Sequence, residues 1–491
     1  MLNRYCATIS TAVVLAAVLT ACSGQPASTP AAVPTAAPAS AAQSATQAPP
    51  APLPTQMVPT TAAPTAAPTA VPAVAAPTTA PTSAAQSATG SPRFTHPTEI
   101  TNPFYPVSLT GHTIALGMEG GKPSRTEVTL LPDTRMIAWD GQQIETRVLQ
   151  FMAAVDGQLV EVAYDYFAQA DDGGVYYMGE DVNNYEDGKV VSQEGSWLAG
   201  RDGAPPSLIM PAHPEVGQIF NPENLPGVVY ETDEILSLSQ KTTTPAGPTD
   251  KGILVKETLM DGSIEHKIYA ANYGITEEQA EDELSDLVLF DRADAKPGAV
   301  PEPLTTIEAQ AEDIIDLVPG HSWEKVTADV AAIAKAWQAY QSQAADDHAP
   351  QPFQEALTAA LERLQKASAA KQATGTMEAA NDLSAAVVDL FTIYHPALPS
   401  DVGWLDVLER QVVLDVAAKD LTAAVDNLAK ANAVWARLKP VVLAHNGPEV
   451  ATRFEDSLTL QQNALNKEDA SALATEAENG LALVDALEQL F

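Results

Sequence analysis

Two carboxylates are predicted to lie opposite each other on a β-hairpin. The segment DYFAQADDGGVYYMGED carries the turn dipeptide Asp172-Gly173 between two runs that are rich in aromatic residues. A two-residue loop at this dipeptide pairs Asp165 with Glu180 and puts Glu161 nearby on the same face. Like charges directly opposite each other destabilise a sheet, so something must compensate this pair.

Three kinds of chemistry would suit these carboxylates. Glu161, Asp165 and Glu180 are a possible site for a hard cation such as Ca²⁺, although Ca²⁺ usually takes about six to eight oxygen ligands. An Arg or Lys from another strand would instead make the pair structural, and this is the interpretation we favour. Two facing carboxylates could also share a proton and act as the acid and base of a hydrolase.

The strands that must position the pair show the alternation of a sheet with one packed face. In LVEVAYDYF, Val160, Val162, Tyr164 and Tyr166 share one face, and the acidic residues lie on the other, which we expect to be the wetter one. About ten similar runs separated by turn dipeptides lie within residues 93–300. They predict an antiparallel β-meander, as a curved sheet, barrel or sandwich.

Several motifs of this region resemble an uncharacterised family of bacterial extracytoplasmic proteins. They are TNPFYP, YDYFAQADDGGVYYMGED, GSWLAGRDGAPPSLIMPAHPEVG and EHKIYAANYG. Asp165 and Glu180 fall on acidic positions of the family pattern, whereas the family's GVG after the EHK strand is Asn272-Tyr273-Gly274 here. The resemblance implies a β domain outside the cytoplasm and implies no activity.

The N-terminus has the order of features found in a bacterial lipoprotein. Arg4 precedes a short apolar run, which ends in the sequence LTAC at Cys22. LTAC resembles a lipobox, so residues 1–21 are predicted to be a signal peptide and Cys22 to be lipidated and anchored in a membrane. Residues 22–92 then form a tether of Ala, Pro and Thr that is predicted to be disordered, because it cannot bury a core.

Composition excludes several classes of protein and partner. The net charge of −37 disfavours nucleic acid as a partner. The two cysteines lie within the first 22 residues, which excludes a Cys-based zinc or redox site in the folded part. Ser322-Trp323-Glu324-Lys325 fits a Ser-x-x-Lys motif, but its companion motifs are missing and Ser322 is better explained as a helix N-cap.

The last third of the chain carries an internal repeat at an offset of 98 residues with helical periodicity. Trp337 corresponds to Trp435, and Asn381 to Asn479. Each copy contains four amphipathic segments, so residues 301–399 and 400–491 are predicted to be tandem four-helix units. The tryptophans are expected in the two cores, and the asparagines in interhelical hydrogen bonds.

The overall prediction is an α+β protein of several domains: an antiparallel β domain followed by an all-α domain. The favoured function is a lipid-anchored, extracytoplasmic binding or scaffolding protein without catalytic activity, whose partner is an unknown protein or small molecule. The alternatives are a carrier of lipid-like ligands in a curved sheet and the hydrolase. No cofactor other than Ca²⁺ is indicated. An apolar concave face would favour the carrier, and an open cleft over the carboxylates would favour the hydrolase.

Overall fold

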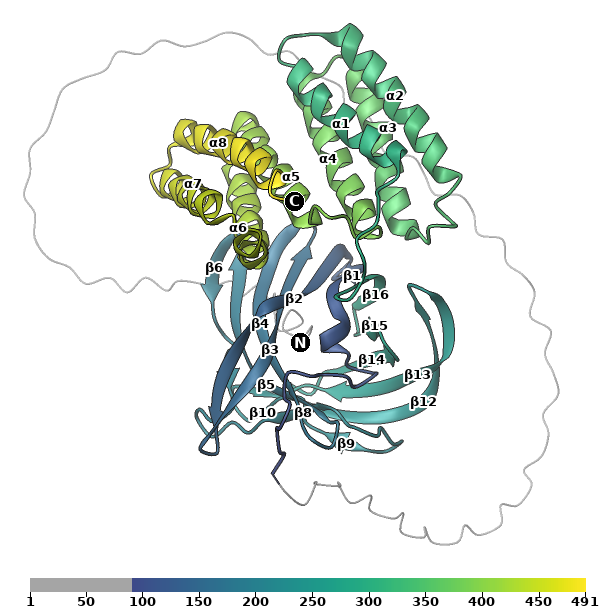
Figure 1. Cartoon of the computed structure of the whole chain (residues 1–491), viewed down its shortest axis with the longest axis vertical. Helices are drawn as coiled ribbons and strands as arrows, with labels where there is room; N and C mark the ends of the chain where they lie inside the picture. Colours follow the sequence, from purple (N-terminus) through teal and green to yellow (C-terminus); the bar gives the residue numbers. More distant parts are fainter. Residues whose placement is uncertain (1–90) are drawn as a thin grey trace, which may run out of the picture. The chain divides into compact units, whose positions relative to one another are not determined.

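The computed structural model describes residues 91–491. The predicted signal peptide, Cys22 and nearly all of the tether lie outside the described residues. Within them, a large antiparallel sheet is followed by eight helices, which confirms the predicted fold class (Figure 1). No helix in this part of the chain is both long enough and apolar enough to cross a membrane.

The sheet is a meander whose first and last long strands pair with each other. Its order is β6-β5-β4-β3-β2-β1-β16-β15-β14-β13-β12-β9, with β7 and β8 added to β5, while β10 and β11 form a separate pair. The strands are β1 (Thr110–Glu119), β2 (Lys122–Trp139), β3 (Gln142–Val155), β4 (Gln158–Gln169), β5 (Val175–Glu186), β6 (Lys189–Ser192), β7 (Trp197–Leu198), β8 (Ser207–Met210), β9 (Ile219–Phe220), β10 (Asn224–Leu225), β11 (Val229–Tyr230), β12 (Thr232–Thr244), β13 (Gly247–Thr258), β14 (Ile264–Ala270), β15 (Gly274–Gln279) and β16 (Glu283–Arg292).

The eight helices form two units with separate cores, because each unit turns the apolar stripes of its own four helices inward. The first unit contains α1 to α4 and the second α5 to α8. Their bounds are α1 (Glu302–Leu317), α2 (Trp323–Gln341), α3 (Gln351–Ala369), α4 (Ala373–Thr392), α5 (Ser400–Ala418), α6 (Leu421–Ala444), α7 (Pro448–Asn466) and α8 (Ala470–Glu488).

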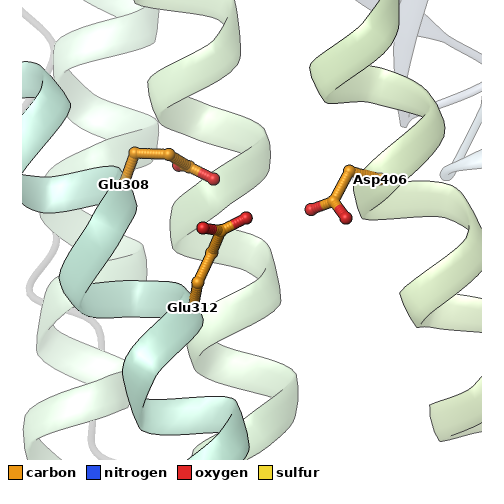
Figure 2. Close-up of side chains that lie close together, drawn as sticks. All are labelled: Glu308, Glu312 and Asp406. Carbon is orange, nitrogen blue, oxygen red and sulfur yellow. The ribbon is translucent and has the colours of Figure 1, made fainter. Parts of the chain in front are cut away.

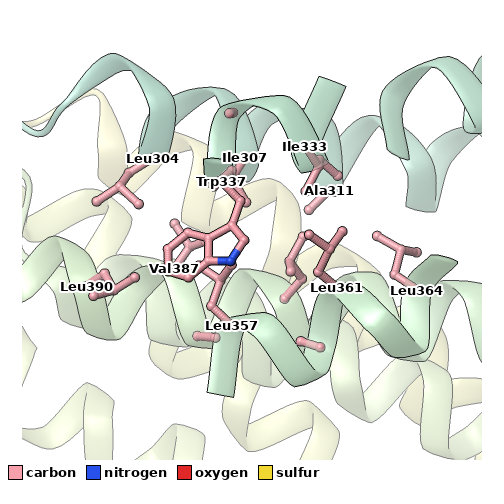
Figure 3. Packing of buried hydrophobic residues seen from close by; sticks show 14 of the residues in the cluster. Leu304, Ile307, Ala311, Ile333, Trp337, Leu357, Leu361, Leu364, Val387 and Leu390 are labelled. Atoms are coloured by element: carbon pink, nitrogen blue, oxygen red, sulfur yellow. The ribbon is translucent and has the colours of Figure 1, made fainter. Parts of the chain in front are cut away.

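Each repeated tryptophan lies in the core of its own unit. Trp337 is surrounded by aliphatic side chains from α1, α3 and α4, including Ile307, Leu357 and Val387 (Figure 3). Trp435 packs against Phe454, with 4.8 Å between the ring centroids. Both indoles are 4 % exposed, so they act as packing anchors and not as a binding surface.

The repeated asparagines do not have equivalent environments. Asn381 on α4 is buried, and its side-chain amide donates to the Val407 carbonyl and to Gln411 on α5. Asn479 on α8 is exposed and bonds only within its own helix, to Glu476. The expected interhelical bond is therefore wrong for Asn479. The physical reason is that α4 packs against the first helix of the next unit, and within residues 91–491 no such unit follows α8.

Buried ion pairs join the sheet to the helices. Glu127 on β2 accepts from Arg437 on α6 at 2.8 Å and from Arg125 at 2.7 Å. Arg125 also pairs with Asp389 on α4, and Arg437 with Asp401 on α5. Burial opposes ionisation of Glu127, but the two guanidinium groups lower its pKa overall. This network ties three helices to one strand.

Candidate functional site

The hairpin brings Asp165 opposite Glu180, as predicted, but by a different route. The first pair of the hairpin is Gln169 with Val175, so the loop has five residues and not two. A β-bulge between Tyr166 and Phe167 then shifts the register by one residue. The longer loop and the bulge offset each other, which restores the predicted pairing.

The predicted exposure of these carboxylates is wrong. Glu161, Asp165 and Glu180 are all buried, and Tyr177 donates a hydrogen bond of 2.8 Å to Asp165. The opposite face of β4 is the one that packs on a helix: Val162 and Tyr164 lie in a cluster with Ala433 of α6. The acidic residues therefore occupy the other face of a strongly curved sheet, which turns inward on itself (Figure 1).

A second set of charges lies on the far half of the sheet, around Lys267 on β14. Its ammonium group is 2.5 Å from Glu257 on β13 and 3.4 Å from Glu278 on β15. Strand pairing extends this set, since Asp233 on β12 is opposite Glu257. Glu265 on β14 is opposite Glu257 on the other edge of β13, so the row of acidic residues continues from β12 across β13 to β14.

The two sets of charges belong to one face of the sheet. Tyr105, which precedes β1, has its pKa raised by burial and then by the charge of Asp165, and the charges of Lys267, Glu278 and Glu257 act on it as well. Asp165 and the Lys267 group therefore approach the same phenol. We call this surface the acidic face; its charged residues are Glu161, Asp165, Glu180, Asp233, Glu257, Glu265, Lys267 and Glu278.

Aromatic rings adjoin the acidic face near Asp165. Phe167 stacks on Tyr177 with 4.9 Å between the ring centroids, and Tyr105 and Trp197 pack against this pair. Tyr177 is also the donor to Asp165. Ring faces beside carboxylates are the combination that binds an organic cation.

Carboxylates outnumber cations on this face. Lys267 is the one buried Lys or Arg among the described residues of the β domain, and it already contacts two carboxylates. Burial and the Glu257 carboxylate raise the pKa of Asp233 well above its ordinary value. Burial and the charges of Glu278 and Glu265 raise the pKa of nearby Glu283 to about 9. Protons thus neutralise part of the negative charge of this face.

Two buried carboxylate oxygens of the acidic face, Asp233 Oδ1 and Glu278 Oε2, accept no hydrogen bond from the described residues. The carboxyl group of Asp233 as a whole is hydrogen-bonded to Glu257. Asp233 and Glu278 are about 1 % exposed. Buried polar atoms without a partner are uncommon and costly, so they indicate where a ligand group would be stabilised.

The Lys267 half of the site was not predicted from the sequence. The signal was present in EHKIYA, where Glu265, Lys267 and Tyr269 alternate with other residues and must share one face. Two charges on the same face as a tyrosine in a strand are unusual for a packed surface. The curvature of the sheet, which brings β14 near β4, cannot be predicted from the local sequence pattern.

The fold and the acidic face together define a class: a β-meander domain with a charged inner face, followed by a tandem helical domain. Comparisons with family models, with curated proteins and with solved structures find no match for this chain. The resemblance of the β domain to an extracytoplasmic family therefore stays a prediction.

Proposed function

We propose that this protein is a lipid-anchored extracytoplasmic binding protein whose β domain binds a small organic cation on the acidic face. The observation that carries the proposal is the pair of leftover carboxylate oxygens, Asp233 Oδ1 and Glu278 Oε2, on a face that holds a single buried Lys. A positively charged ligand would pair with these two oxygens, and the rings near Asp165 would contact its apolar part.

The chemistry of the lining favours a cation over a lipid-like ligand. A carrier of acyl chains needs an apolar concave surface, whereas this one presents carboxylates from β4, β5, β12, β13, β14 and β15. Desolvating those carboxylates against a hydrocarbon chain would be costly. We therefore propose a cation as the ligand, in preference to the lipid-like ligand of the alternative carrier function.

The binding test uses benzyltrimethylammonium, a cation that does not titrate. We expect saturable binding to the full chain by calorimetry, and about tenfold or greater weakening in the double variant Asp233→Asn with Glu278→Gln, which removes the Glu278 charge and the carboxyl group of Asp233. Affinity should rise from pH 6 to pH 9, because nearby Glu283, with a pKa of about 9, then loses its proton.

The control is Glu186→Gln, an exposed acid at the end of β5, which should bind as the wild type does. Benzyl alcohol, a neutral analogue, should bind far more weakly than the cation. Equal affinity for both compounds, or full binding by the double variant, would overturn the proposed ligand class. A neutral lipid found by native mass spectrometry in the purified protein would favour the carrier instead.

The anchor is tested separately. Cys22→Ser removes the thiol that is lipidated in the lipobox class, so we expect the protein to leave the membrane fraction. Mass spectrometry of the wild-type N-terminus should show acyl chains on Cys22. A wild-type protein without acyl mass would rule out the anchor and leave the ligand proposal standing.

A further inference from the structure

Glu409 on α5 is a carboxyl group inside the core of the second helical unit. It is 0 % exposed, and Leu405 and Val412, about one turn away on either side, belong to the apolar cluster of that unit. The side-chain amide of Gln461 on α7 donates to both carboxyl oxygens, at 3.0 and 2.8 Å. No Lys, Arg or His among residues 91–491 forms an ion pair with Glu409, so the carboxyl group has an amide partner and no counter-charge.

The first unit has an apolar layer at the same level of its core. Counted from the first residue of each helix, Glu409, Gln461 and Gly480 stand at the positions that are occupied in the first unit by Ala311, Leu364 and Leu383. The three residues of the first unit are all 0 % exposed. Gly480 on α8 makes room for the longer side chain, because a Cβ atom there would lie 2.6 Å from the carboxyl carbon of Glu409. The second unit therefore packs a polar layer where the first unit packs an apolar one.

The surroundings of Glu409 favour its neutral form. Burial raises its pKa to about 8, although the bonds from the α7 amide act in the opposite direction, and the charge of Asp406 adds to the rise. Asp406, about one turn earlier on α5, faces Glu308 and Glu312 of α1 (Figure 2), and Arg410 pairs with Asp406. No charged group of α6, α7 or α8 acts on Glu409. The described helices around this carboxyl group thus offer no cation that would stabilise its charge.

Gln461 also carries an atom that needs a donor. Its Oε1 atom is buried and has no hydrogen-bond partner among the described residues. A neutral carboxyl group can donate its O–H to an amide oxygen while its carbonyl oxygen accepts from the amide N–H, so that both groups are satisfied at once. An ionised carboxylate has no O–H, which leaves Oε1 without a donor and a charge without a cation in the core. The layer therefore fits the neutral acid.

We propose that Glu409 and Gln461 form a pH-sensitive switch in the core of the second helical unit. The neutral acid pairs with the amide and stabilises the packed unit. Loss of the proton draws water to the carboxylate and loosens α7 and α8 from α5. The apolar layer of the first unit contains no such pair, so the switch acts on the second unit alone and is independent of the ligand of the acidic face.

The direction of the pH effect follows from where the proton is held more tightly. In the unfolded chain Glu409 has the ordinary pKa of 4.5, which is below its value in the packed unit. Its contribution to stability is therefore fully present below pH 4.5 and is lost progressively as the pH rises from 4.5 through about 8. Each pH unit within this range raises the equilibrium constant for opening the second unit by up to about tenfold.

Hydrogen exchange of the full chain at pH 6 and pH 8, corrected for intrinsic exchange rates, measures the opening of each unit. Between these pH values, the opening constant of α7 and α8 should rise at least about tenfold more in the wild type than in Glu409→Gln, which is neutral at every pH. Glu478→Gln removes an exposed acid of α8 and should keep the wild-type response. Amides of α1 to α4 should respond equally in all three proteins. An equal response of α7 and α8 in the wild type and in Glu409→Gln would overturn the proposal.

A second variant covers the case in which Glu409→Gln does not fold. Glu409→Ala with Gln461→Leu and Gly480→Leu copies the apolar layer of the first unit and should also lose the pH response of α7 and α8. The infrared spectrum of the wild type minus that of either variant should contain the C=O band of a protonated carboxyl group at pH 6. A carboxylate band in its place would show that Glu409 is ionised in the packed unit, and the switch would be ruled out.

Discussion

Replacing Glu127 with Ala should lower the free energy of unfolding by about 3–5 kcal/mol, because it leaves a buried guanidinium group short of its partner. Arg437 has a side chain only 2 % exposed and would keep Asp401 alone, and Arg125 would keep Asp389. Urea unfolding at pH 7 measures the loss. The pH dependence follows from the lowered pKa of Glu127: its contribution to stability is fully present above pH 4.5 and is lost progressively as the pH falls from 4.5 through the lowered pKa of the folded state.

The control for this change is Glu186→Ala, which removes an exposed carboxylate and should alter stability by no more than about 0.5 kcal/mol. Replacing both members of the pair, as Glu127→Leu with Arg437→Met, should cost less than Glu127→Ala alone. A loss below about 1 kcal/mol for Glu127→Ala would show that the sheet and the helices are not held by this network.

Truncating either repeated tryptophan should cost about 3–5 kcal/mol, as for other large core side chains. Trp337→Ala should unfold the first unit more readily and Trp435→Ala the second, since each indole lies in a separate core. Hydrogen exchange, read unit by unit, distinguishes the two. Trp323, which is only half-buried at the start of α2, is the matched control and should cost clearly less.

If Trp337→Ala loosened both units equally, the two cores would be one cooperative block. That outcome would contradict the separation of the clusters described above. Phe454 stacks near Trp435, so Trp435→Phe should recover most of the loss in the second unit, whereas a small aliphatic residue should not.

Local rules predicted much of this architecture. Strand alternation and turn dipeptides predicted the β domain, and the 98-residue repeat predicted eight helices, because both depend on residues close together in sequence. The pairing of Asp165 with Glu180 was right although the loop and the bulge were not anticipated. The longer loop shifts the register by one residue from the predicted pairing, and the bulge shifts it back.

Features that depend on distant contacts could not be predicted. Glu127 and Arg437 meet across 310 residues of sequence, and nothing near either residue indicates its partner. The exposure of the hairpin carboxylates was wrong for the same reason: which face of β4 turns inward depends on the docking of α6. Alternation shows that two faces differ, but it does not show which one water reaches.

The difference between Asn381 and Asn479 extends to the neighbouring positions of the two helices. Asn381 and Val388 are buried against α5 and Ser384 is buried beside Glu308, whereas their counterparts on α8 are Asn479, Ala482 and Ala486. The two alanines are smaller than Ser384 and Val388, so they offer less contact surface than Val388 gives against Gly403 of α5. The outer face of α8 therefore lacks the side chains with which α4 contacts α5.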